Sequence, residues 1–211
     1  MAGELDKERK IMLFMIGLIA LEFMIVLIIG HVSPLQRFED AQRAMVTMEM
    51  GRSAENTIHA HTSATFNDWF IQTGLMHSSM PRNPSYAYRP NALPLTRMGL
   101  LFHQRILALW ALLWLSMYRM FLWLAWMPAL LPLIVAAVWD GWNRRRIGQW
   151  KFQFQSATRH YMGSKTAKGM MALAVMLFFV PIPIPPLLIP LWAVFFAVGL
   201  HTWTTWLPKR M

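Results

Sequence analysis

Residues 137–169 read AVWDGWNRRRIGQWKFQFQSATRHYMGSKTAKG, a basic and aromatic stretch between two long apolar runs. From position 139 onward it holds seven Lys or Arg residues and one acidic residue, with Trp, Phe and Tyr among them. Such a composition fits binding to nucleic acid, anchoring at a membrane surface, or docking onto another protein. The fold class of the protein is indicated by the apolar runs on either side of this stretch.

The composition is typical of a membrane protein. Hydrophobic residues make up 56% of the 211 residues and charged residues only 14%, whereas soluble domains carry about 25% charged residues. Eleven Trp residues are present, a type enriched at membrane–water interfaces. The absence of Cys excludes disulfides, thiolate catalysis and Cys-based zinc sites.

The first apolar run, Ile11 to Gly30, is interrupted only by Glu22. A helix of this length measures about 30 Å, the thickness of a bilayer's hydrocarbon core. No small-x-small cleavage pattern follows it, so we interpret residues 1–30 as a retained membrane anchor rather than a cleaved signal.

The second apolar run, Ile106 to Val138, would form a helix of about 50 Å, too long for one bilayer crossing. We therefore expect a long helix over 100–139 in which Phe121–Val138 is the membrane span. This register puts Arg119 at the opposite membrane surface. A separate span over 102–118 is the alternative.

The third apolar run, Met170 to Trp206, contains the sequence PIPIPP. Proline removes amide donors and blocks helix continuation. We therefore expect 170–211 to form a membrane hairpin with a basic tail, its legs spanning about 168–183 and 187–207. Its turn comprises Pro181, Pro183, Pro185 and Pro186.

The basic residues predict the orientation. Cytoplasmic loops are enriched in Lys and Arg, and the most basic segments are the N-terminus, 140–169 and the C-terminus. These three are expected on the cytoplasmic side and 31–99 outside. The predicted fold is all-α, with about four membrane segments.

The outside segment is predicted to be a small helical unit. Residues 34–75 are rich in helix-forming types, begin at Ser33-Pro34 and stop at Gly74. Four prolines in 80–94 predict an irregular return loop.

No pattern predicts catalysis. His59 and His61 are two positions apart, whereas a helical zinc site needs a spacing of four with a Glu partner. Lys165 and Thr166 match the end of a phosphate loop, but the glycines that such a loop needs are missing. We expect no enzyme activity, no cofactor and no metal.

Glu22 must face protein, because a carboxylate in contact with lipid is costly. We interpret it as a polar clamp with His201 as the candidate partner. A proton-linked or ion-linked site in a small transporter or channel subunit is the alternative.

The basic stretch supplies the candidate docking residues. Its aromatic rings suit the headgroup layer and its cations suit anionic lipid or an acidic protein face. Nucleic acid fits less well, because a short loop fixed at both ends reaches into a groove poorly. The candidates are Asp140, Trp142, Arg144, Arg145, Arg146, Trp150 and Lys151.

Several of these motifs resemble a family of conjugative membrane proteins from integrating elements and large plasmids. The similar elements are WDGWNRRRIG, Ser156, His160-Tyr161, the AKG at 167–169, PIPIPPLLIP, TWLPKRM and, upstream, NDWFIQTGL. Within them Asp140, Gly141, Arg144, Arg146, Ile147, Ser156, Lys168 and Pro185 match the family pattern.

The resemblance implies a bacterial inner-membrane component of a type IV secretion system for DNA transfer. It also implies a coupling-protein ATPase as partner and a scaffolding or docking role. An entry-exclusion or envelope-stabilising protein is a rival interpretation. Self-association into a homo-oligomer is left open, and direct contact with nucleic acid is not expected.

Overall fold

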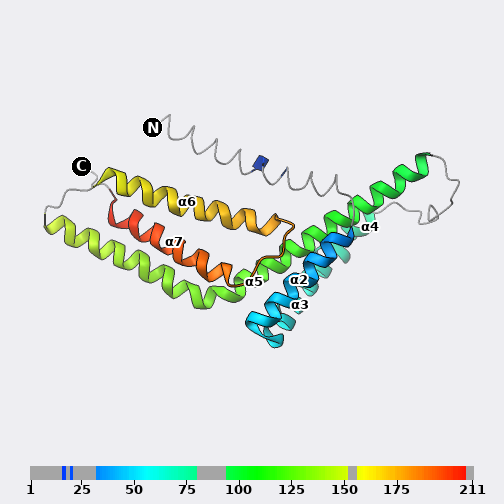
Figure 1. The fold of residues 1–211 in the computed structure, drawn as a ribbon, viewed down its shortest axis with the longest axis horizontal. Coiled ribbons are helices and arrows are strands. Elements are labelled where there is room, and N and C mark those ends of the chain that lie inside the picture. Colours follow the sequence, from blue (N-terminus) through cyan, green and yellow to red (C-terminus); the bar gives the residue numbers. More distant parts are fainter. Residues whose placement is uncertain (1–15, 18–19, 21–31, 80–93, 152–155, 208–211) are drawn as a thin grey trace. The chain divides into compact units, whose positions relative to one another are not determined.

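The computed structural model describes residues 32–79, 94–151 and 156–207, together with Ile16, Gly17 and Ala20 (Figure 1). All regular secondary structure in these residues is helical, which confirms the all-α prediction. Nearly all of the predicted anchor, including Glu22, and most of the return loop at 80–94 lie outside them. The elements divide into two compact units: residues 1–121 with 176–185, and residues 122–175 with 186–211.

Unit 1 contains a helical hairpin. Helix α2 spans Val32–Met50 and α3 spans Arg52–Phe66. Gly51 lies between them with a φ of 89°, a left-handed conformation that glycine adopts without steric cost. The helical prediction for 34–75 is thus confirmed, but the break at Gly51 was not foreseen.

The hairpin continues into two short helices. They are η1, a π-helix over Asn67–Ile71, and α4, which spans Leu75–Ser79. Gly74 lies between them with a φ of 74°, which confirms the predicted helix stop.

Helix α5 is the longest element and is shared by the two units. It spans Pro94–Trp150 and includes Pro128 and Pro132 in its interior. Because it is one helix, residues 102–118 continue directly into the predicted span. In unit 1, Ala108 and Leu112 on α5 are buried with Leu35 on α2 in an apolar core.

Unit 2 combines the C-terminal part of α5 with α6, which spans Ala157–Phe179, and α7, which spans Leu188–Thr205 (Figure 1). Trp123 on α5 packs edge-on against Trp192 on α7 at 4.6 Å between ring centroids. The Nε1 of Trp192 donates a hydrogen bond of 2.6 Å to the carbonyl of Met170 on α6. α7 therefore contacts both other helices of the unit.

Two described helices are long and apolar enough to cross a membrane: His103–Trp150 within α5, and Leu188–Thr205. The predicted segment 168–183 is not one of them, and 11–30 lies almost wholly outside the described residues. The prediction of about four membrane segments therefore stays a prediction.

Candidate functional site

The candidate docking residues lie on the last three turns of α5 and on the turn residue Lys151 that follows. The stretch 140–169 is thus not one continuous loop, because α5 extends to Trp150 and α6 starts at Ala157. We call the adjoining parts of unit 2, residues 139–151, 156–168 and 201–207, the basic end. Three helix termini build this site.

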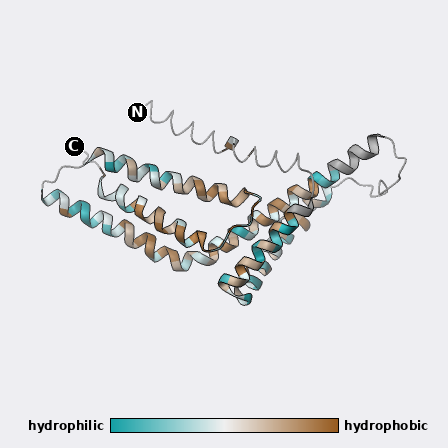
Figure 2. Cartoon of the chain, viewed as in Figure 1, coloured by the Kyte–Doolittle hydropathy of each residue, from teal (hydrophilic) through white to brown (hydrophobic). Residues whose placement is uncertain are grey.

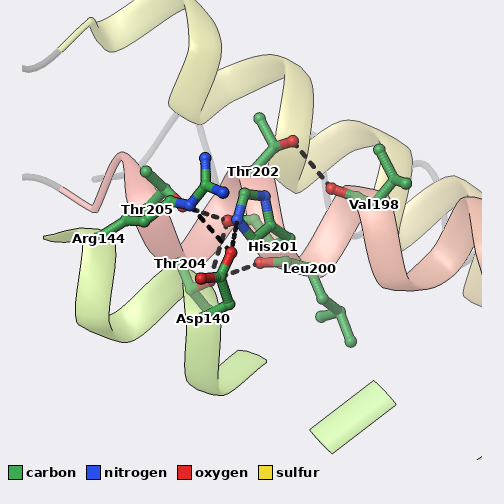
Figure 3. Close-up of polar contacts among 8 residues, drawn as sticks. All are labelled: Asp140, Arg144, Val198, Leu200, His201, Thr202, Thr204 and Thr205. Atoms are coloured by element: carbon green, nitrogen blue, oxygen red, sulfur yellow. Dashed lines mark hydrogen bonds and ion pairs between the residues drawn. The ribbon is translucent and has the colours of Figure 1, made fainter. Parts of the chain in front are cut away.

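Asp140 joins α5 to α7 at the basic end (Figure 3). Its Oδ2 accepts from the Nε of Arg144 one turn later at 2.9 Å and contacts the Nε2 of His201 at 2.9 Å. His201 was predicted to clamp Glu22, which the structure does not describe; within the described residues its polar side-chain partner is Asp140. When His201 is protonated, the carboxylate bridges two cations.

Gly141 allows α5 to approach α7 this closely. A Cβ at this position would lie 2.0 Å from the Oγ1 of Thr204 and 2.8 Å from the carbonyl of His201. That hydroxyl also bonds the carbonyls of Leu200 and His201 (Figure 3). The Asp-Gly pair thus has a joint role: the carboxylate makes the polar contact, and the glycine leaves room for it.

α6 and α7 pack through small residues. A Cβ on Gly163 would lie 2.5 Å from the backbone nitrogen of Trp203, and one on Gly199 would lie 2.9 Å from that of Ala167. Gly163 and Ala167 are four apart, the small-x-x-x-small spacing that lets helix backbones approach closely. The spacing is visible in the sequence, but only the structure identifies α7 as its partner.

Three cations at the basic end lie over aromatic rings. The guanidinium of Arg145 is 5.5 Å from the ring of Trp142, and that of Arg159 on α6 is 4.9 Å from Trp206. The Nζ of Lys165 is 4.5 Å from the Tyr161 ring. The interleaved aromatic and basic residues therefore make contacts within the chain.

The three consecutive arginines have different surroundings. Arg144 pairs with Asp140 and Arg145 lies over Trp142, whereas Arg146 and Lys151 are exposed. Within the described residues, neither of these two makes an ion pair. Trp150 beside them is 85% exposed. Arg146, Trp150 and Lys151 are therefore the candidate residues most open to a partner.

A second polar site, in unit 1, holds the first part of the proline turn, by which we mean residues 180–187. The turn is non-helical between the end of α6 and the start of α7, as predicted from its prolines. Four of its residues lack an amide N–H but keep a carbonyl, and the last carbonyls of α6 have no intrahelical donor. The segment therefore has more acceptors than donors.

Arg119 supplies donors to this segment. Its Nη1 bonds the carbonyls of Leu177 at 3.0 Å, Phe178 at 3.4 Å and Val180, and its Nη2 bonds that of Ile182. A guanidinium carries five donors and no acceptor, so it supplies the N–H donors that the proline turn and the end of α6 lack. Arg119 is only 2% exposed, so its side chain is buried in protein. Its expected position at a membrane surface stays a prediction.

Gln42 on α2 holds the same turn from another helix. Its Nε2 donates to the carbonyl of Ile184 at 2.5 Å, and its Oε1 accepts from the amide of Ile184 at 2.7 Å. Gln42 is fully buried, so these bonds satisfy polar groups that water cannot reach. We call Gln42 and Arg119 together the turn clamp. Sequence reasoning missed its role, although the donor shortage of PIPIPP indicates that such donors are needed.

An ion pair joins the two helices of the hairpin. The Nε of Arg43 on α2 lies 2.6 Å from Oε1 of Glu55 on α3, and Glu55 is buried. This hydrogen bond raises the pKa of Arg43 above its ordinary value. Burial raises the pKa of nearby Glu39. The pair therefore links the two helices of the hairpin.

The histidines of the hairpin contact aromatic rings of α5. His59 lies 5.5 Å from Trp114, and His61 lies 6.0 Å from Phe121, measured between ring centroids. In the described part of the chain, no three His, Cys, Asp or Glu side chains lie close enough to hold a metal ion.

A family model for proteins like the IncC plasmid conjugative DNA transfer protein DtrJ matches residues 35–207. The match covers the hairpin from Leu35, the turn clamp and the described basic end. Neither the curated proteins nor the solved structures include a match to the chain. The resemblance to conjugative transfer proteins is thereby confirmed, and the chain belongs to the DtrJ-like family of plasmid conjugative DNA transfer proteins.

Proposed function

We propose that this protein is a non-enzymatic component of the bacterial inner membrane that docks the coupling-protein ATPase of a conjugative DNA-transfer system. The observation that carries the proposal is the composition of unit 2, which has apolar outer faces on its helices and cations gathered at one end. Figure 2 shows hydrophilic residues of α5 and α6 gathered at that end. Family membership supports the role in conjugation.

The distribution of side chains in unit 2 supports membrane insertion. On α6 the buried residues are Gly163, Ala167 and Ala174. The exposed hydrophobic residues there are larger: Tyr161, Met162, Met171, Leu173 and Val175. α7 likewise exposes large apolar side chains: Leu191, Val194, Phe195 and Val198. Helices in water present polar outer faces, whereas membrane helices pack small residues together and turn large ones to lipid.

An apolar hollow on α5 fits the same placement. It has a volume of about 390 Å³ and is lined by Ile134, Val135, Val138, Trp139 and Trp142. No charged side chain lines it, so acyl chains can fill it. The two indoles lie where Trp is enriched, next to the headgroups.

The basic end is proposed to face the cytoplasm. Asp140 on α5 meets His201 on α7, and Arg159 on α6 meets Trp206, which follows α7. The end of α5, the start of α6 and the end of α7 are therefore on one side of unit 2. Because Lys and Arg favour the cytoplasmic side, both chain termini are assigned there and the α2–α3 hairpin to the periplasm.

Cysteine labelling tests this orientation. The chain has no Cys, so Ser53→Cys on α3 and Thr158→Cys on α6 each introduce one exposed thiol. A membrane-impermeant maleimide added to spheroplasts is expected to label position 53 and to leave 158 unlabelled. Both should react after detergent permeabilisation. Labelling of 158 alone in sealed spheroplasts would reverse the orientation.

Docking is tested by neutralising the two open cations, as Arg146→Gln with Lys151→Gln. Each basic residue near an anionic surface contributes about 1 kcal/mol, so we expect about thirtyfold weaker association with the coupling ATPase. Membrane insertion should not change. The measurement is co-purification in mild detergent, together with the frequency of DNA transfer.

The matched control removes the same charge from unit 1, as Arg37→Gln with Arg52→Gln, at two exposed positions on α2 and α3. Co-purification of this variant should equal that of the unmodified protein. If both double variants retain the ATPase equally well, anionic lipid remains the partner of the basic end and the docking proposal is wrong.

A further inference from the structure

The exposed face of α5 is apolar near residue 135 and basic near its C-terminal end. Val135, Trp139, Arg146 and Trp150 lie on one stripe, because their spacings of four, seven and four residues bring each side chain back to nearly the same direction. All four are exposed. Val135 and Trp139 line the apolar hollow, while Trp150 is the last residue of the helix.

The charges mark where the hydrocarbon core must end. Asp140 and Arg144 form an ion pair in which both side chains are more than half exposed. Ions in contact with lipid are costly, so the boundary cannot lie beyond Asp140. Trp139 and Trp142 are then at headgroup level, where indoles are favoured.

Trp150 lies well beyond that level. It follows Asp140 by ten residues of continuous helix, a rise of about 15 Å, or about 14 Å at a typical tilt. The headgroup layer is only about 5–8 Å thick on each side. An indole that is 85% exposed therefore stands in water rather than among lipids.

We propose that Trp150 is the central contact of a protein-docking surface completed by Arg146 and Lys151, and that its partner is an acidic protein face with an apolar pocket for the indole. The inference rests on the proposed function, since it assumes the membrane placement of unit 2. It adds that this surface binds protein rather than lipid. The partner is expected to be acidic because two cations, Arg146 and Lys151, are exposed beside the indole. Trp and Arg are the types most enriched among residues that dominate binding.

Two tryptophans on the same face of α5 provide a matched test. In intact donor cells, a photoreactive phenylalanine analogue replaces either Trp150 or Trp139, and adducts are identified by mass spectrometry. We expect position 150 to give an adduct with an acidic peptide of the coupling ATPase. Position 139 should give no protein adduct. Separately, Trp150→Ala should weaken co-purification about tenfold or more, and Trp139→Ala less than twofold.

The outcomes separate this inference from the proposed function. If the ATPase co-purifies normally with Trp150→Ala and position 150 gives no adduct with it, the docking surface is wrong while the proposed function stands. Adducts of the ATPase at both positions would contradict the placement of Trp139 among headgroups and of Trp150 in water. An adduct at position 150 with a second copy of this chain would show that the surface binds another copy and not the ATPase. If the chain stays in the dense fractions of a flotation gradient while the membranes rise, the proposed function itself fails.

Discussion

Replacing Gly163 by leucine is expected to separate α6 from α7 and to prevent stable folding of unit 2. Even the first added carbon would lie 2.5 Å from the backbone nitrogen of Trp203, and 2.9 Å from the carbonyl carbon of Thr202. Those atoms belong to helical backbone and cannot rotate away. Overpacking costs about 1–3 kcal/mol where side chains can adjust, so a backbone clash should cost about 3 kcal/mol or more. The measurement is the melting temperature in detergent.

Gly169→Leu on the same helix is the matched control. A Cβ there would meet no atom within 4 Å. Both substitutions replace glycine in a helix, which should by itself stabilise the helix by roughly 0.5–1 kcal/mol. Gly169→Leu is therefore expected to melt at or above the temperature of the unmodified protein. Equal melting temperatures for the two leucine variants would show that α6 does not pack on α7 through Gly163.

Replacing Arg119 by methionine is expected to release the proline turn. The change removes the donor to four carbonyls, among them those of Leu177 and Ile182, in a part of the protein where Arg119 is nearly fully buried. Hydrogen bonds to a charged group contribute about 1.5–3 kcal/mol each, so a total loss of about 3 kcal/mol or more is expected. Limited proteolysis within 180–187 and thermal melting measure it.

Two further variants make this result specific. Arg105→Met changes an exposed arginine on the same helix and should have no effect on either measurement. Arg119→Lys keeps the charge but loses the planar fork of donors, so it should restore only part of the stability. A turn that resists proteolysis equally in all three variants would mean that Arg119 does not hold it.

The sequence predicted features that depend on local chemistry. The helical segment before Gly74 follows from residue preferences, and the turn between α6 and α7 follows from what proline removes. The family resemblance was read from motifs around Asp140 and Pro185. Each of these inferences uses neighbouring residues alone.

The features that the sequence did not predict join distant positions. Gln42 and Ile184 are 142 residues apart along the chain, and neither residue type identifies the other. The same holds for Asp140 and His201, 61 residues apart. A lone polar residue in an apolar neighbourhood indicates that a partner exists, but only the packing of the helices identifies it.

The turn clamp also bears on how the chain is made. Gln42 and Arg119 leave the ribosome before Ile182 and Ile184. During synthesis these two polar side chains are therefore present before the carbonyls that they bond in the folded protein have been made. A nascent chain that stops before the proline turn would keep these groups without their final partners, in a half-finished unit 1. The last third of the sequence therefore supplies the carbonyl acceptors that Gln42 and Arg119 bond in the folded protein.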